Sequence, residues 1–264
     1  MKLLRIDVYL TENGFTKSRE QAKELIRSGC VFVGNCQVTK PAYDCGDNAD
    51  VELKGKLPEY VGRGGLKLEK ALSEFGIMLD GRVCIDIGAS TGGFTDCMLK
   101  NGAKFVYAVD VGHGQLDDSL VNDSRVLNME GCNIRNMSSE NFPLPVNFIS
   151  ADVSFVSLKL ILPKISELLP NGGEAVVLIK PQFEAGRQAV GKNGIVKDQK
   201  SHIKVLTDIA SVCFSEGLPV RRLTYSPITG GSGNIEYLAY LKNGGEYLGF
   251  DVKKIVSEAF GALK

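Results

Sequence analysis

The chain has 264 residues, with 31 basic and 31 acidic side chains, so its formal net charge at pH 7 is zero. This length allows one large domain and a small second one, and 44% hydrophobic and 23% charged residues are ordinary for a globular protein. The balanced charge excludes a surface that is basic throughout, so any nucleic-acid surface must be local. The sequence has no apolar run of about 18 residues and no signal-peptide pattern, and we expect a cytoplasmic protein that does not enter a membrane.

Seven cysteines, an odd number that is widely spread, fit a reducing compartment better than a disulfide framework. Cys30, Cys36 and Cys45 fall in one short region and could be metal ligands. They lack a Cys-x-x-Cys pair and a fourth partner, and His113 and His202 lie far from them in the sequence. We therefore expect small buried cysteines and no metal site.

Residues 1–54 are expected to form a small α+β module. Apolar spacing predicts a helix over 3–10 and a second helix that begins at Thr16 or Ser18 and ends before Gly29. Short strands are predicted at 30–33, 37–38 and 49–53.

A basic surface is predicted on this module. The candidate RNA-binding residues are Arg5, Lys17, Arg19, Lys23 and Arg27, joined by Arg63 beyond the linker. An ordinary solvated helix face is the alternative interpretation. Such a surface would bind phosphates and supply affinity without reading sequence.

Residues 55–62 are expected to be a linker, and residues 63–264 a second domain that starts with a helix over 66–75. Its central stretch, 83–95, predicts a buried strand, a glycine-rich turn and the start of a helix. In the dinucleotide pattern G-x-G-x-x-G, counted from Gly88, Ser90 takes the place of the second glycine. The Asp86 carboxylate would repel a diphosphate but could receive the cationic amino acid end of S-adenosylmethionine.

A second buried strand, 106–109, ends in Asp110, which is well placed to accept hydrogen bonds from ribose hydroxyls. The two acids therefore favour S-adenosylmethionine over NAD as the cofactor. The predicted cofactor-binding residues are Asp86, Gly88, Ala89, Ser90, Thr91, Gly92, Gly93, Phe94, Asp110 and Asp152.

The rest of the chain alternates between strands and helices. Further strands are predicted at 125–129, 146–151, 174–179, 220–225 and 235–241, and further helices at 113–120, 157–169, 198–215 and 252–260. Alternation of this kind predicts a parallel, doubly wound, Rossmann-like sheet, with its ligands beyond the carboxyl ends of the strands.

Four polar residues are expected to meet at that edge. Asp152 and Lys180 follow neighbouring strands, Lys67 lies on the helix before the first strand, and Glu236 opens the last strand. Two lysines and two carboxylates in one pocket suit removal of a proton from a weakly acidic alcohol. A lysine has an ordinary pKa of about 10.4, so a lysine base would need a lowered pKa. The alternative is that each residue belongs to a separate surface salt bridge.

The chain resembles the TlyA (hemolysin A) family, in which an S4 RNA-binding domain precedes a methyltransferase domain of the FtsJ type. The motifs that carry the resemblance are R-I-D-x-x-L at 5–10, T-K-S-R-E-Q-A at 16–22, G-A-S-T-G-G-F-T at 88–95, D-V-G-H-G-Q-L at 110–116, A-D-V-S-F at 151–155, K-P-Q-F-E at 180–184 and G-N-I-E-Y at 233–237. The resemblance implies methylation of ribose 2′-hydroxyls (cytidine) in ribosomal RNA with S-adenosylmethionine, on ribosomal subunits as partners. It also implies that Lys67, Asp152, Lys180 and Glu236 are the catalytic tetrad.

Two other functions are compatible with the family's name or architecture. A membrane-active hemolysin would need a long apolar helix or a strongly basic amphipathic segment, and the sequence has neither. A non-catalytic RNA-binding protein with a degenerate methyltransferase domain is disfavoured because both cofactor acids and all four tetrad residues are present.

Overall fold

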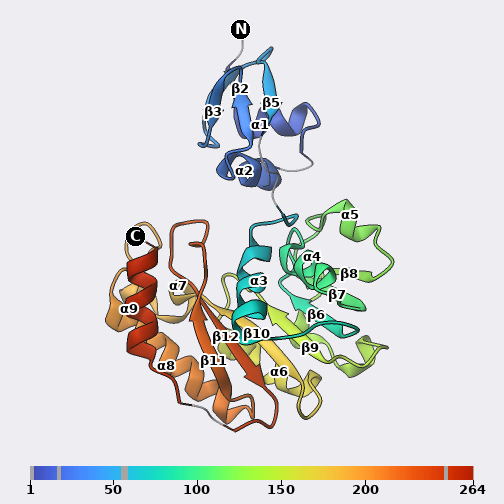
Figure 1. Cartoon of the computed structure of the whole chain (residues 1–264), viewed down its shortest axis with the longest axis vertical. Coiled ribbons are helices and arrows are strands. Elements are labelled where there is room, and N and C mark those ends of the chain that lie inside the picture. The colour runs from blue at the N-terminus through green and yellow to red at the C-terminus, as the bar shows by residue number, and fades with distance from the viewer. Residues whose placement is uncertain (1–2, 17–18, 55–58, 247–248, 264) are drawn as a thin grey trace. The chain divides into compact units, whose positions relative to one another are not determined.

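A computed structural model describes residues 3–16, 19–54, 59–246 and 249–263. The chain divides into two compact units, residues 1–63 and residues 64–264 (Figure 1). This division follows the end of the expected linker by one residue, and residues 55–58 of that linker lie outside the described part of the chain.

The N-terminal unit combines two helices with short antiparallel strands. Its elements are β1 (Leu3–Arg5), α1 (Ile6–Glu12), α2 (Arg19–Arg27), β2 (Val31–Val33), β3 (Cys36–Val38), β4 (Asp44–Gly46) and β5 (Val51–Leu53). Strand β2 lies between β3 and β5, and β1 pairs with β4. The helix predicted over 3–10 begins only at Ile6, because residues 3–5 extend to pair with β4. Ile6, Leu10 and Ile26 fill the core of this unit.

Cysteines in this unit were expected to be buried. Cys30 and Cys45 are buried, but Cys36 at the start of edge strand β3 is exposed, so the prediction is wrong for that residue.

The second unit is built on a seven-stranded sheet. The strands are β6 (Val83–Ile87), β7 (Phe105–Asp110), β8 (Val126–Glu130), β9 (Phe148–Ala151), β10 (Glu174–Ile179), β11 (Val220–Tyr225) and β12 (Tyr237–Lys242), in the spatial order β11-β12-β10-β9-β6-β7-β8. The expectation of a wholly parallel sheet is wrong at one strand. Strand β12 runs antiparallel to both β10 and β11, because it returns directly from β11 as the second strand of a hairpin.

Helices cover both faces of this sheet. They are α3 (Gly64–Phe75), α4 (Gly93–Lys100), α5 (Asp118–Val121), α6 (Leu162–Leu168), α7 (Pro181–Glu184), α8 (Gln199–Ser215) and α9 (Val252–Ala262), with short 3₁₀ helices at Ile134–Asn136, Ser139–Asn141, Leu158–Leu160 and Arg187–Ala189. Helices α8 and α9 lie side by side, and α3 packs against α4 (Figure 1). Along β6, Ile85 packs into the core that α6, α8 and α9 share, whereas its neighbour Asp86 faces α4.

Two predicted helices are shorter than expected. The helix predicted over 113–120 is confined to α5, because the Glu130 carboxylate accepts the backbone N–H groups of Gly114, Gln115 and Leu116 and holds them in a loop. The helix predicted over 157–169 is divided into a 3₁₀ turn and α6. Pro163 lies in the first turn of α6, where its missing N–H group is tolerated.

Candidate active site

A cavity of about 470 Å³ lies at the carboxyl ends of the four neighbouring parallel strands β8, β7, β6 and β9. Four of the predicted cofactor residues line it: Gly88, Ser90, Asp110 and Asp152. The wall also contains residues that the sequence did not single out for this role, which are Ile87, Val109, Val111, Gln115, Cys132 to Arg135, Val153 to Val156 and Ile161. The segment 132–135 follows β8. Ligands in such sheets lie beyond the carboxyl ends of the strands, so the same rule applied to β8 would have predicted this segment as part of the site.

The turn after β6 depends on backbone conformations that favour glycine. Gly88 has a φ of +83°, and a β-carbon there would lie 2.5 Å from the Asp152 carbonyl oxygen. Gly92 has a φ of +96° and is the N-cap of α4, so no side chain caps the start of this helix. The turn therefore brings the backbone of 88–90 close to the segment that carries Asp152.

Asp110 ties the cavity wall together. Its carboxylate accepts the backbone N–H of Ser90 at 2.8 Å on one oxygen and that of Gly112 at 2.7 Å on the other. A carboxylate offers about four acceptor positions, so both oxygens can accept further hydrogen bonds. Asp110 thus joins the turn after β6 to the loop after β7 and still presents acceptors to the cavity.

Asp86 lies beneath the turn rather than in the cavity. It is fully buried and accepts hydrogen bonds from Thr95 Oγ1 at 2.7 Å and Ser150 Oγ at 3.0 Å. Burial raises its pKa to about 7, although the hydrogen bonds from Thr95 and Ser150 act in the opposite direction. In this conformation Asp86 joins α4, at Thr95, to β9, at Ser150, and does not line the cavity.

The remaining predicted cofactor residues pack the turn. Ala89 and Phe94 are buried, and Gly93 begins α4. At Gly92 a β-carbon would lie 2.2 Å from the Leu120 side chain, so this glycine allows close packing of the turn against α5. None of these four residues, nor Thr91, lines the cavity.

The four predicted catalytic residues come together. Lys67 Nζ lies 2.7 Å from Glu236 Oε2 and 3.9 Å from Asp152 Oδ2, and Lys180 Nζ lies 2.6 Å from Asp152 Oδ1. The side chains form a chain of alternating charge in the order Glu236, Lys67, Asp152, Lys180, with exposures of 3%, 10%, 19% and 10%. Burying four charges is expensive for stability, so the arrangement points to function rather than to stabilisation of the fold.

Two further side chains extend this group. Lys180 Nζ donates to Ser154 Oγ at 2.7 Å, and Gln182 Nε2 donates to Glu236 Oε1 at 3.3 Å. Ser154 belongs to the motif A-D-V-S-F and Gln182 to K-P-Q-F-E, in which only Asp152 and Lys180 were predicted to be catalytic. Asp152 Oδ1 forms the close ion pair with Lys180 without hydrogen-bond geometry, and within the described residues no donor satisfies it or Gln182 Oε1.

Asp152 connects the tetrad with the cavity, because it belongs to both. Ser154 likewise lines the cavity and receives the Lys180 hydrogen bond. A reactant held in the cavity therefore lies beside the two lysines.

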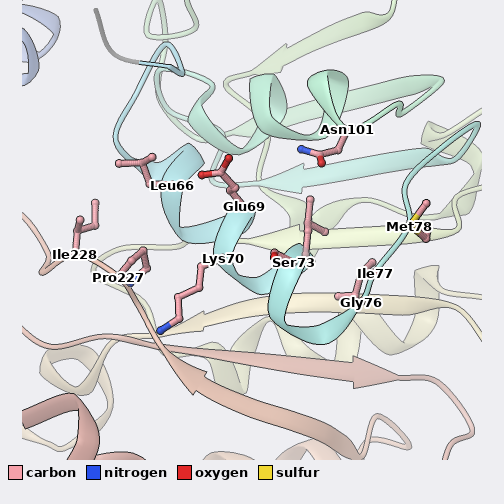
Figure 2. Close-up of a pocket in the computed structure, with 11 residues that line it drawn as sticks. Leu66, Glu69, Lys70, Ser73, Gly76, Ile77, Met78, Asn101, Pro227 and Ile228 are labelled. Atoms are coloured by element: carbon pink, nitrogen blue, oxygen red, sulfur yellow. The ribbon is translucent and has the colours of Figure 1, made fainter. Parts of the chain in front are cut away.

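A larger hollow, of about 710 Å³, runs along α3 (Figure 2). Apolar side chains such as Leu66, Met78 and Ile228 make up much of its wall, and no tetrad residue lines it. The lysine in this wall already has partners. Lys70 Nζ donates to the Tyr225 backbone carbonyl at 2.7 Å and lies 3.7 Å from the centre of the Tyr225 ring. Of the four predicted catalytic residues, Asp152 lines the smaller cavity and none lines this hollow.

The predicted basic residues of the N-terminal unit are partly paired. Asp7 is fully buried and accepts hydrogen bonds from Arg5 and Arg19, whose side chains remain 46% and 51% exposed. Burial raises the pKa of Asp7, but the two guanidinium groups outweigh it and hold the pKa below its ordinary value. Asp7 therefore fixes two arginines at the surface.

On α2, Arg19, Lys23 and Arg27 recur every four residues and so share one side of the helix. Lys17 lies outside the described residues, and Arg63 is half-buried at the end of this unit.

Across the described residues, no group of three or more His, Cys, Asp or Glu side chains could hold a metal ion, and no helix is long and apolar enough to span a membrane.

Comparison with known sequences identifies both units. Residues 60–243 match the FtsJ-like methyltransferase family, and residues 4–51 match the S4 domain. Hemolysin A of Brachyspira hyodysenteriae is 46% identical over 90% of this chain and 99% of its own. The 16S/23S rRNA (cytidine-2′-O)-methyltransferase TlyA of Mycobacterium tuberculosis is 38% identical over 90% of this chain and 89% of its own.

Solved structures of similar proteins agree with this family assignment. A proposed hemolysin from Streptococcus thermophilus, 44% identical, aligns with a TM-score of 0.80 over 99% of this chain and 97% of that one. A likeness to a proposed RNA methyltransferase from Pyrococcus horikoshii, at 18% identity and a TM-score of 0.50, shows the shared sheet fold alone. The chain belongs to the FtsJ-like methyltransferase family and carries an S4 domain before its methyltransferase domain.

Proposed function

We propose that this protein transfers a methyl group from S-adenosylmethionine to the 2′-hydroxyl of a cytidine in ribosomal RNA. The observation that carries the proposal is that Asp152 belongs both to the cavity wall and to the buried tetrad. With this position, a cofactor in the cavity and an alcohol substrate at the tetrad would lie on two sides of one carboxylate. The named activity of the M. tuberculosis relative supports the substrate.

The cavity fits S-adenosylmethionine. Its volume is within the range of small-molecule sites, and its acidic groups suit the ligand's hydroxyl and ammonium groups. Asp110 would accept hydrogen bonds from the ribose hydroxyls, and Gly88 and Ser90 would let the ligand approach the turn. Asp86, being fully buried, would act by holding that turn. When bound, the cofactor supplies an electrophilic methyl group.

The tetrad would prepare the hydroxyl. The ribose oxygen must lose its proton as it bonds to the methyl carbon, and Lys180, beside the cavity, is the residue we assign to hold or accept that proton. Asp152 and Ser154 fix its amino group through the contacts of 2.6 Å and 2.7 Å. Glu236 holds Lys67, which in turn lies against the other Asp152 oxygen.

The S4 unit would supply affinity for ribosomal RNA. The surface made by Arg5, Arg19, Lys23 and Arg27 would neutralise phosphates without reading bases. Lys17, which precedes α2 in the sequence, and Arg63, at the end of this unit, are the other predicted members. A ribosomal substrate agrees with the cytoplasmic location expected from the sequence.

The test is transfer of tritiated methyl groups to isolated small and large ribosomal subunits that lack the modification. Wild-type protein should label one or both. Lys180→Ala should lower the rate by about 10²–10⁴-fold, and Lys180→Arg nearly as far, because a guanidinium does not release its proton near neutral pH. Substantial activity in the arginine variant would show that Lys180 acts only as a fixed positive charge.

The hemolysin name of one relative suggests membrane lysis as an alternative activity. Dye leakage from liposomes tests it in parallel, and we expect no leakage. Leakage without methyl transfer would contradict the proposal.

A further inference from the structure

Two segments carry the reactive side chains, and they are joined by more than the tetrad. Residues 152–158 follow β9, and residues 180–184 follow β10. At one end Lys180 contacts Asp152 and Ser154. At the other end, Glu184 contacts the start of the 3₁₀ helix at 158–160.

The Glu184 carboxylate makes two short hydrogen bonds to the first segment. Its Oε2 accepts from Ser157 Oγ at 2.6 Å, and its Oε1 accepts from the backbone N–H of Leu158 at 2.7 Å. Neither donor is a cation. Burial raises the pKa of Glu184, while both hydrogen bonds lower it. Partly burying a carboxylate costs free energy that neutral donors only partly offset, so Glu184 is not placed here for stability alone.

The turn between these two attachments is strained. Phe155 has a φ of +61°, in a region that residues with a β-carbon rarely adopt, and its side chain is 93% exposed. Its ring lies 5.1 Å from that of Phe183. Strain of this kind persists only where the surroundings hold it. The Lys180 contacts hold the turn before Phe155, and Glu184 holds it after.

We propose, resting on the methyltransferase function proposed above, that Glu184 is a positioning residue for methyl transfer. By fixing Ser157 and Leu158, it keeps the turn 153–156 closed against Lys180. The Ser154 hydroxyl is thereby held between the Lys180 amino group and the cofactor cavity. Glu184 touches neither reactant in this arrangement and acts through Ser154 and Lys180.

Glu184→Gln is the sharpest variant, because an amide retains one acceptor oxygen but cannot accept the second hydrogen bond. Displacements approaching 1 Å in a reacting group cost about 10²-fold in rate, so we expect kcat to fall by about 10–100-fold. The Kd for S-adenosylmethionine should change by less than about 5-fold, since Asp110 and Gly88 are unaffected. Ser157→Ala, which removes one donor, should have a smaller effect in the same direction.

The control is Glu167→Gln on α6, which removes an exposed carboxylate paired with Lys164 and should leave kcat unchanged. The decisive measurement adds Glu184→Gln to Lys180→Ala. If Glu184 acts through Lys180, the second substitution should cost less than about 3-fold in single-turnover rate.

An unchanged kcat in Glu184→Gln would overturn the proposal. So would a full, independent loss in the Lys180→Ala background, since that result indicates a general structural role. If Glu184→Gln does not fold, Ser157→Ala alone decides, and its wild-type kcat would refute positioning. Failure of the proposed function is seen separately, as an inactive wild type.

Discussion

Gly88 offers the clearest test of how the glycine-rich turn after β6 (residues 88–92) is connected with the tetrad. A β-carbon at this position would lie 2.5 Å from the Asp152 carbonyl oxygen and 3.0 Å from its carbon, and both are backbone atoms that cannot rotate away. Ordinary contact begins at 3.4 Å, so Gly88→Ala must separate the two segments by nearly 1 Å. The φ of +83° adds a conformational cost of about 1–2 kcal/mol.

Because Lys180 Nζ lies only 2.6 Å from the Asp152 carboxylate, such a shift changes the reactive geometry directly. We expect kcat for ribosomal RNA methylation to fall by about 10–100-fold. The matched control is Gly217→Ala: its φ of +74° carries the same backbone cost, but its β-carbon would meet open space. That variant should lose about 1–2 kcal/mol in urea denaturation and keep its kcat.

The measurement is single-turnover methyl transfer at a temperature where denaturation curves show both variants folded. If Gly88→Ala keeps the wild-type rate within about 3-fold, the contact with Asp152 does not set the reactive geometry. Equal losses in the two variants would refute the reasoning as well.

The other predictions concern cofactor, RNA and pH. Asp110→Ala should weaken S-adenosylmethionine binding by about 1–3 kcal/mol in calorimetry, because it removes acceptors from a polar site. Replacing Arg19 and Lys23 with glutamine should weaken binding to ribosomal subunits and flatten its salt dependence by about one unit per lost phosphate contact, without changing cofactor affinity. Asp86 has a folded-state pKa raised to about 7, so its contribution to stability is present below about pH 4 and is lost as the pH rises to 7. Asp86→Asn should therefore gain about 3 kcal/mol relative to wild type between pH 5 and pH 8, measured by chemical denaturation.

Lys204 and Asp208, an exposed ion pair on α8, provide the controls. Asp208→Ala should leave cofactor affinity unchanged, and Lys204→Gln should leave the salt dependence unchanged. Unaltered affinity in Asp110→Ala would remove that residue from the ribose role, and an unaltered salt slope would exclude the α2 surface. A pH-independent difference between wild type and Asp86→Asn would mean that Asp86 is ionised throughout.

The tetrad could be predicted because strand ends in a parallel sheet meet at one edge. Asp152 and Lys180 each follow a buried apolar run, and that pattern alone brings them together. Glu236 was predicted as well, although it immediately precedes β12 rather than opening it. Because β12 is antiparallel to β10, its amino end lies at the edge where β10 ends.

Other features depend on contacts that have no sequence period. The buried Asp86 carboxylate is satisfied by hydrogen bonds from Thr95 and Ser150, which are far apart in the chain. Likewise, the loop at 113–116 is stabilised by Glu130 on β8. Its carboxylate accepts backbone N–H groups of this segment and so competes with the hydrogen bonds that a helix would need.

The position of β12 in the sheet determines when the domain can complete its folding during synthesis. It is the last strand of the sheet in the chain, yet it is inserted between β10 and β11. Lys67 and its partner Glu236 are 169 residues apart, so the buried ion pair forms only after this strand is made and inserted. A nascent chain that stops before Glu236 contains the turn after β6 but only three of the four residues we propose to be catalytic. If the proposed function holds, methyl transfer begins only when the sheet is nearly complete.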